Sequence, residues 1–224
     1  GAHTVGLWGI SRAGWICPLI INQYQNIAFW ISVSGVDGKE SFGYLFEQNL
    51  RINGHPEKEI SHLVEEWKKG NEITHQGGRY DEYLAATEQL RKNSFIQRFN
   101  GGRQVTEEGF YNYQEFFKQQ LWDTTAQLQI YIEDFESLLA KVNCPVLALF
   151  GEQDMTVDWQ KTKALYERIL SPQRLVIESF PRCNHNLFQC KTGGFYEFED
   201  NNLAWNRCDG FLDTMTNWLQ KLGN

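Results

Sequence analysis

The chain has 224 residues, of which 21 are basic and 28 acidic, so its formal net charge is −7. A hydrophobic fraction of 42% and an aromatic fraction of 14% suffice for a buried core and exclude a disordered chain. The acidic balance argues against nucleic acid as a partner, because a phosphate-binding surface needs a basic stripe. No apolar run approaches the ~20 residues that cross a bilayer, so we expect no membrane span.

The five cysteines are an odd number and do not show the pattern of a dense disulfide framework. This favours a reducing compartment such as the cytoplasm. No basic-then-apolar signal region precedes Thr4, and residues 4–10 already have the pattern of a core strand. We therefore expect the chain to begin inside its fold, which leaves its localisation open.

Residues 1–36 contain two β-type runs around one helical stretch. The runs are 4–10 and 27–35, and Pro18 lies about one turn inside the helical stretch between them. Strand, tight turn, helix and strand at this spacing form a βαβ unit, which implies parallel strands.

Residues 37–142 are polar, rich in aromatic residues and patterned for helices. Apolar side chains at helical spacing predict a helix that Pro56 opens and Gly70 closes. Similar patterns predict further helices over 80–90 and around 116–121. About a hundred helical residues between two sheet strands are expected to form a cap.

The C-terminal part returns to alternating strands and helices. The apolar run from Pro145 to Asp154 is typical of a strand buried on both faces. An amphipathic helix follows near 158–170, then a last strand over 174–180 and a final helix that contains Phe211 and Leu222.

These patterns predict an α/β fold with a mostly parallel sheet flanked by helices. Residues 1–36 and 143–224 form its core, and residues 37–142 form a helical cap or lid insertion.

Ser11 lies between the first strand and the first helix, with Gly9 before it and Ala13-Gly14 after it. Small neighbours are needed at a sharp strand-to-helix turn, because such a turn is strained and its backbone packs closely. The helix N-terminus behind the serine would stabilise developing negative charge. The alternative is that Ser11 merely caps the helix, and the hexapeptide alone leaves both interpretations open.

Asp154 ends the segment Gly151-Glu152-Gln153-Asp154, which directly follows the strand 145–150 at the edge where open α/β sheets place their sites. A helix cap or a loop role is the commoner use of such an aspartate. Asp158 is a nearby competitor, but its position suits the cap of the helix that starts at Trp159.

Of the five histidines, His185 is the one that follows a sheet strand at its C-terminal end. Surface or capping use is the ordinary alternative for a single histidine. Cys183, His185 and Cys190 do not have the intervals of a metal site and lack a fourth ligand, so we expect no metal.

The serine, the acid and the histidine each follow a strand of their own, in that order. A serine hydroxyl is a poor nucleophile until an imidazole removes its proton, and a carboxylate then fixes the imidazole tautomer and stabilises its charge. Parallel strands bring the three side chains to one edge of the sheet, although they lie far apart along the chain.

The segments VGLWGISRAGW, CPVLALFGEQD and FPRCNHNLF resemble the α/β-hydrolase superfamily, most of all its bacterial dienelactone-hydrolase and acylaminoacyl-peptidase-like members. The resemblance covers residues 4–36 and 143–222, while the insertion matches only in position and helical character.

The resemblance implies Ser11 as nucleophile, Asp154 as triad acid and His185 as general base. It implies the backbone N–H of Arg12 as one oxyanion-hole donor, and it implies no cofactor. Ala13 stands where the GxSxG pattern has its last glycine, which is a small departure.

The larger departure is at the start of the chain. Complete members of this superfamily have about four strands before the nucleophile, and their second oxyanion donor usually comes from that region. The strand 4–10 is thus expected to be an apolar edge, which invites pairing with another chain. We expect either a homo-oligomer formed through this edge or a complex with an N-terminal segment.

The leading functional hypothesis is a serine hydrolase that cleaves a small-molecule carboxylic ester, or else a thioester or short peptide, through an acyl-enzyme. One alternative is a catalytically incomplete fragment or interaction module with a vestigial triad, and another is acyl transfer to an alcohol or amine. Aromatic residues of the insertion either line an acyl or aryl pocket or form its own core, and their helical spacing favours the core. These are Phe46, Trp67, Tyr83, Phe110, Phe116 and Phe117.

Overall fold

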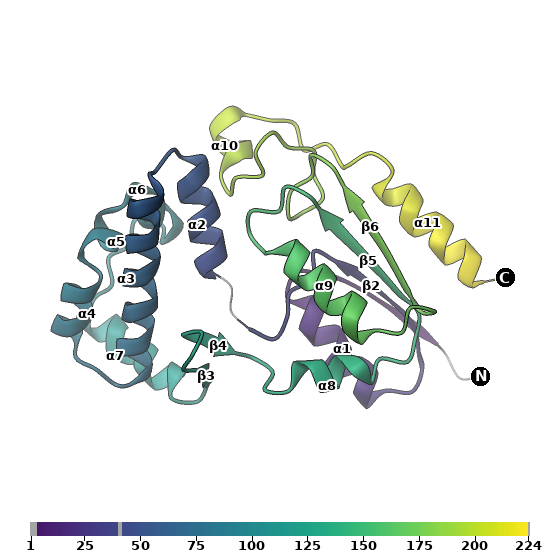
Figure 1. The fold of residues 1–224 in the computed structure, drawn as a ribbon, viewed down its shortest axis with the longest axis horizontal. Coiled ribbons are helices and arrows are strands. Elements are labelled where there is room, and N and C mark those ends of the chain that lie inside the picture. Colours follow the sequence, from purple (N-terminus) through teal and green to yellow (C-terminus); the bar gives the residue numbers. More distant parts are fainter. Residues whose placement is uncertain (1–3, 40–41, 224) are drawn as a thin grey trace. The chain divides into compact units, whose positions relative to one another are not determined.

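A computed structural model describes residues 4–39 and 42–223 of the chain (Figure 1). The chain divides into two compact units, unit 1 with Gly1–Gly38 and Asp134–Asn224, and unit 2 with Lys39–Glu133. Helix α8 (Phe135–Ala140), which the sequence analysis placed in the insertion, belongs to unit 1.

Unit 1 is built on a four-stranded parallel sheet with the order β1-β2-β5-β6. Every residue of β5 is buried, as expected for a continuously apolar strand covered on both faces. This confirms the predicted α/β class with a parallel sheet flanked by helices. The strands are β1 (Val5–Ile10), β2 (Ile27–Val33), β5 (Val146–Gly151) and β6 (Leu175–Phe180).

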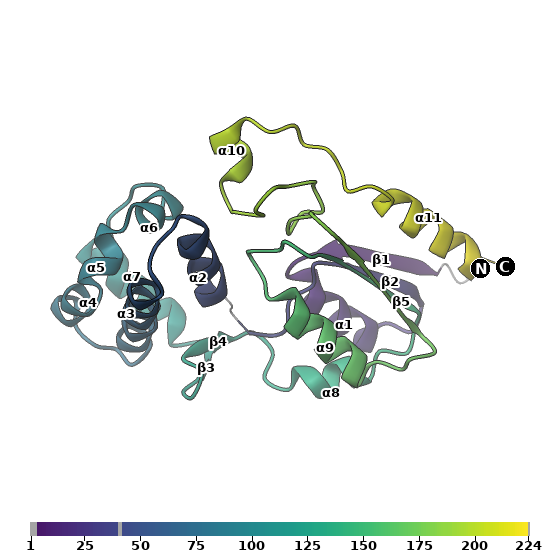
Figure 2. The same cartoon turned by 45° about the horizontal axis from the view of Figure 1, so that its top comes forward.

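Helices cover both faces of this sheet. The helices α1 (Ala13–Gln23), α8 and α9 (Trp159–Ile169) lie on one face and α11 (Phe211–Leu222) on the other (Figures 1 and 2). Trp218 of α11 packs edge-on against Phe29 of β2, with 5.8 Å between the ring centroids. The short helix α10 (Glu197–Asn201) lies in the segment between β6 and α11.

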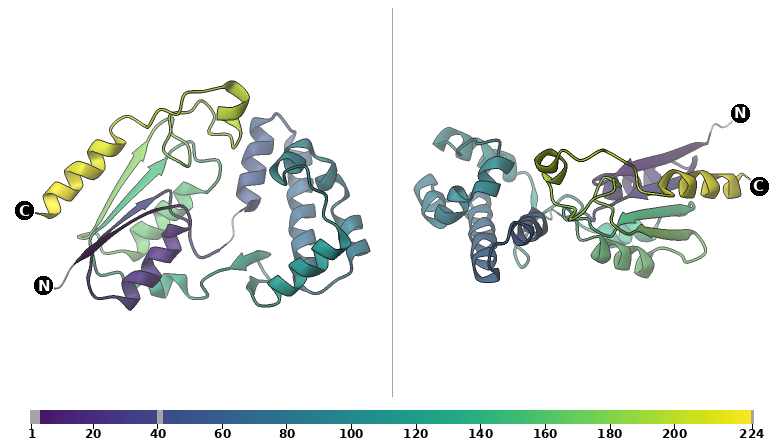
Figure 3. Two further views of the ribbon diagram at one scale, coloured as in Figure 1. Left: turned by 180° about the vertical axis from the view of Figure 1, so that it is seen from behind. Right: turned by 90° about the horizontal axis from the view of Figure 1, so that it is seen from above.

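Unit 2 combines helices with a short antiparallel hairpin that the sequence analysis did not predict. The long helix α3 contacts α2, α4, α5 and α7 (Figure 3). In the part of the chain that is described, no helix has both the length and the apolar character needed to cross a bilayer. The elements of unit 2 are α2 (Phe42–Ile52), α3 (Glu57–His75), α4 (Tyr80–Ala86), α5 (Glu88–Lys92), α6 (Ser94–Phe99), α7 (Glu107–Phe117), β3 (Leu121–Asp123) and β4 (Leu128–Ile130).

Three helix ends differ from the expectation. Gly70 does not close its helix, since α3 continues to His75. Gly70 is buried there, and a Cβ at this position would lie 2.6 Å from the Thr87 methyl carbon, so the glycine permits close packing. Thr87 separates α4 from α5 within the single helix expected over 80–90. Leu121 lies in β3 rather than in a helix, because a short apolar run does not distinguish the two.

Most of the aromatic residues singled out in the insertion pack within unit 2. Phe46, Phe110 and Phe117 are buried. The ring of Phe46 meets Trp67 at 5.7 Å, and that of Tyr83 meets Phe110 at 5.1 Å. These side chains form a core of unit 2, whereas Phe116 is exposed.

Candidate active site

Ser11 lies in the turn between β1 and α1 and has a φ of 57°. This left-handed backbone is uncommon for a residue other than glycine, and such residues cluster at functional turns. The N–H of Ser11 donates to the carbonyl of Val33 at 2.9 Å, and its carbonyl accepts from the N–H of Gly14 at 2.8 Å and of Val36 at 3.1 Å. Both α1 and the neighbouring strand β2 therefore hold the turn in place.

The small residues around Ser11 are required by close contacts. A Cβ on Gly9 would lie 2.3 Å from the Cβ of Ala13. A Cβ on Gly14 would lie 2.5 Å from the backbone N and O of Val36. Any larger side chain at either glycine would displace the turn that carries Ser11.

Asp154 and His185 are in direct contact. The Nδ1 of His185 lies 2.7 Å from Oδ2 of Asp154, whose side chain is completely buried. The other carboxylate oxygen, Oδ1, accepts from the backbone N–H groups of Thr156 and Val157 at 2.9 Å each. A carboxylate oxygen can only accept, so the Nδ1–H of His185 donates to Oδ2 of Asp154, and Nε2 is left as the nitrogen that can take up a proton.

The competitor Asp158 has the capping role expected for it. It precedes α9, and its Oδ1 accepts from the backbone N–H of Lys161 at 3.0 Å. Arg12 is the N-cap residue of α1, so its N–H lies at the start of that helix, directly after Ser11.

His185 belongs to a loop of residues 181–193, here called the His185 loop. The buried Asn184 shapes its tip, because its side-chain oxygen accepts from the N–H groups of Asn186 and Phe188 at 3.0 Å each. The two legs of the loop are joined where the N–H of Cys190 donates to the carbonyl of Arg182 at 2.9 Å.

A disulfide between Cys183 and Cys208 ties the His185 loop to the segment before α11. The N–H of Cys208 also donates to the carbonyl of Leu187 at 3.1 Å. The sequence alone does not predict this pair, because two cysteines 25 residues apart have no spacing that marks them as partners.

The structure brings together the acid and the histidine but not all three side chains. Within residues 4–39 and 42–223, no hydrogen bond joins Ser11 to His185. Ser11 follows β1 and Asp154 follows β5, two strands further along the same edge of the sheet. At about 4.8 Å per strand, the two strand ends are about 10 Å apart, a distance that the Ser11 and Asp154 side chains can bridge together with an imidazole between them. Catalytic hydrogen bonds are often loose before substrate binds.

Free thiols near these residues are poor candidates for the nucleophile. Burial raises the pKa of Cys17, which packs behind the Ser11 turn, to about 11. Burial, followed by the nearby Glu197 carboxylate, raises the pKa of Cys190 to about 12. Both therefore stay protonated at neutral pH, whereas a nucleophilic cysteine needs its thiolate.

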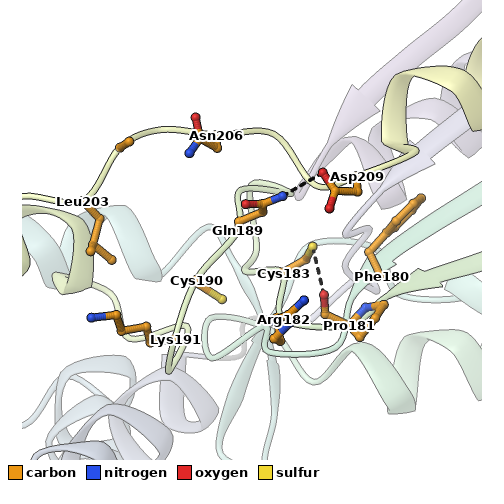
Figure 4. A pocket seen from close by; sticks show the side chains of 11 residues that line it. Phe180, Pro181, Arg182, Cys183, Gln189, Cys190, Lys191, Leu203, Asn206 and Asp209 are labelled. Atoms are coloured by element: carbon orange, nitrogen blue, oxygen red, sulfur yellow. Dashed lines mark hydrogen bonds between the residues drawn. The ribbon is translucent and has the colours of Figure 1, made fainter.

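No cluster of three or more His, Cys, Asp or Glu side chains suited to a metal ion occurs among the described residues. A pocket of about 390 Å³ lies between the His185 loop and the segment 203–209, and Figure 4 shows Arg182, Cys183 and Lys191 among the residues that line it. The triad candidates do not line this pocket.

Unit 1 is an α/β unit whose parallel sheet carries the candidate residues at its carboxyl edge, where open α/β sheets place their sites. A profile of the dienelactone hydrolase family matches residues 127–216, which include Asp154 and His185 but not Ser11. The chain is thus similar to this family over about two fifths of its length, in its C-terminal part. No protein of curated function matches the sequence.

Solved structures with a similar arrangement include three esterases. An esterase, RhEst1, from Rhodococcus sp. ECU1013 is 15% identical over 97% of this chain, with a TM-score of 0.43. A thermophilic esterase from Thermogutta terrifontis is 13% identical over 99%, and a carboxylesterase from Nitrososphaera gargenis 14% identical over 98%, both with a TM-score of 0.44. This chain spans 66% of the length of each of the three, just under two thirds.

Proposed function

We propose that the chain carries the centre of a serine hydrolase that cleaves a small-molecule carboxylic ester through Ser11, His185 and Asp154. The contact of 2.7 Å between His185 and the buried Asp154 is the main support for this proposal. The left-handed backbone of Ser11 at the carboxyl end of a neighbouring strand is consistent with it. The similarity of residues 127–216 to the dienelactone hydrolase family supports hydrolysis as the type of reaction.

In this mechanism, Nε2 of His185 takes the proton of the Ser11 hydroxyl as the oxygen attacks the ester carbonyl. Asp154 holds the imidazole in the required tautomer and stabilises its positive charge. His185 then gives the proton to the leaving alcohol, and Ser11 remains acylated. A water molecule, deprotonated by His185, attacks the acyl-enzyme and releases the carboxylic acid and the free serine.

Negative charge on the carbonyl oxygen needs hydrogen-bond donors in the tetrahedral intermediates. The backbone N–H of Arg12 is our candidate for one donor, because it follows the nucleophile and opens α1. We expect the second oxyanion-hole donor to come from the part of the fold that precedes the nucleophile in complete members of the superfamily. Its absence from this chain would lower turnover without removing the reactivity of Ser11.

A fluorophosphonate probe tests the assignment of the nucleophile. We expect the probe to label Ser11 and the variant Ser11→Ala to lose all labelling. Ser34→Ala is the matched control, since Ser34 also directly follows a sheet strand and has a left-handed φ of 44°. We expect labelling of this control to persist, and labelling that survives Ser11→Ala would refute the proposal.

The second candidate is a catalytically incomplete fragment with a vestigial triad, which the lack of a Ser11–His185 hydrogen bond favours. Turnover of short p-nitrophenyl esters distinguishes the two. The hydrolase proposal predicts turnover that falls by on the order of 10³-fold or more in Asp154→Asn. A folded chain with neither labelling nor turnover would support the fragment instead.

A further inference from the structure

Gln153 lies beside Asp154 in the turn after β5 and is joined to the segment that leads to His185. Its backbone N–H donates to the carbonyl of Cys183 at 2.9 Å. The preceding N–H, that of Glu152, donates to the carbonyl of Phe180 at 3.0 Å. The turn that carries the acid is thus attached to the outgoing leg of the His185 loop.

The side chain of Gln153 reaches the returning leg of the same loop. Its Nε2 donates to the carbonyl of Lys191 at 3.1 Å, and its Oε1 accepts from the thiol of Cys190 at 3.2 Å. The raised pKa of Cys190 keeps that thiol protonated as a donor. Figure 4 shows Cys183 on one leg and Cys190 and Lys191 on the other.

Direct packing adds to these hydrogen bonds. A Cβ on Gly193 would lie 1.8 Å from the carbonyl oxygen of Gln153, so the returning leg passes very close to this residue. The buried Glu197 carboxylate holds that leg by accepting from the N–H groups of Lys191, Thr192 and Gly193. The position of the returning leg is therefore fixed from both sides.

We propose that Gln153 is a positioning residue that sets the geometry between Asp154 and His185 by holding both legs of the His185 loop against the turn carrying the acid. This inference rests on the proposed function. A serine relay needs its groups within a fraction of an ångström of the productive arrangement. The neighbouring Glu152 has no such role, because its side chain is exposed and pairs with Ser179.

The test replaces the amide while keeping its size. Gln153→Met removes both side-chain hydrogen bonds, and Gln153→Glu keeps an acceptor for Cys190 but has no donor for Lys191. We expect kcat to fall by about ten- to a hundredfold in Gln153→Met, with a smaller loss in Gln153→Glu and KM changed less than twofold. If Gln153 had a purely structural role, Gln153→Met would lower the melting temperature, and kcat would not fall selectively while KM stays nearly constant.

Gln189→Met is the matched control. Gln189 lies on the same loop, but its side chain donates to Asp209 at 2.9 Å and makes no hydrogen bond to the turn after β5. We expect its kcat to stay within twofold of that of the unmodified chain. Equal losses in Gln189→Met and Gln153→Met would overturn the proposal.

A spectroscopic readout separates this inference from the hydrolase proposal. The imidazole ¹⁵N shifts of His185 report its tautomer, and they are assigned with a His185→Gln variant. We expect the Nδ1–H tautomer in the unmodified chain and a shift towards a mixture in Gln153→Met, whether or not the chain turns over esters. Unchanged shifts in a folded Gln153→Met would refute the positioning role, while absent probe labelling alone would refute only the hydrolase.

Discussion

At the scale of single residues, the Ser11 turn depends on the contact between Gly9 and Ala13. We predict that Gly9→Ala lowers the free energy of unfolding by about 1–3 kcal/mol, because its Cβ would lie only 2.3 Å from the Cβ of Ala13. Urea unfolding measures this change. We expect probe labelling of Ser11 to fall in parallel, since the turn must shift.

The double variant Gly9→Ala/Ala13→Gly provides the control. Removing the Ala13 methyl group leaves the next nearest heavy atom 3.8 Å from the new Cβ, an ordinary contact. Adding Gly9→Ala to Ala13→Gly should therefore lower the free energy of unfolding much less than adding it to the unmodified chain. This difference is the coupling energy of the double-mutant cycle. Additive effects of the two substitutions would contradict the assigned contact.

Cys190 predicts a pH dependence of stability. Its pKa in the folded chain is raised to about 12, whereas an unfolded cysteine titrates near about 8.5. Between these values the unfolded chain loses a proton that the folded chain keeps, so this contribution to stability is lost as the pH rises above about 8.5. Cys190→Ala should flatten the decline in unfolding free energy between pH 8.5 and about 11. Equal slopes for variant and unmodified chain would contradict the prediction.

The sequence identified residues whose position is set by strand order, but not those that act through local contacts. Asp154 and His185 were found because each follows a strand, and the structure joins them at 2.7 Å. Gln153 and Asn184 had no such signal, since their hydrogen bonds depend on the path of the His185 loop. The placement of the Ser11 hydroxyl against His185 stays a prediction.

At the scale of elements, strands and helices with a strong apolar period were predicted well. The continuously apolar β5 and the capped helix α9 are examples. The hairpin of β3 and β4 was missed, because three-residue strands are too short to show a period. The disulfide was missed for a related reason, since it depends on the tertiary path of two loops.

The disulfide joins the His185 loop covalently to the segment before α11, so the two segments cannot separate. For a separation of 25 residues, we predict that removing the cross-link in Cys183→Ala/Cys208→Ala lowers the free energy of unfolding by about 3 kcal/mol. Urea unfolding with and without dithiothreitol measures the effect. The unmodified chain should respond to the reductant and the double variant should not, so an equal response in both would contradict the prediction.

At the scale of the whole molecule, the free edge of the sheet in unit 1 predicts association. Among the residues that the structure describes, β1 pairs with β2 alone, in the order β1-β2-β5-β6. Because the N–H of Ser11 bonds to Val33 of β2, the alternating backbone groups of Gly6, Trp8 and Ile10 point away from the sheet. Such an edge is a template for a further strand.

We propose that a second copy of this chain pairs with that edge through a two-fold axis, joining the two sheets at their β1 strands. Trp8 is 57% exposed on the strand, so a charge there should block edge pairing without disturbing the core.

Light scattering should give twice the mass of one chain, and Trp8→Lys should give the mass of a single chain. Trp205→Lys is the matched control, since Trp205 is 60% exposed but lies outside the sheet, and it should remain dimeric. A single-chain mass for the unmodified protein at micromolar concentration would rule out the dimer, because the exposed edge alone would then not suffice to hold two copies together.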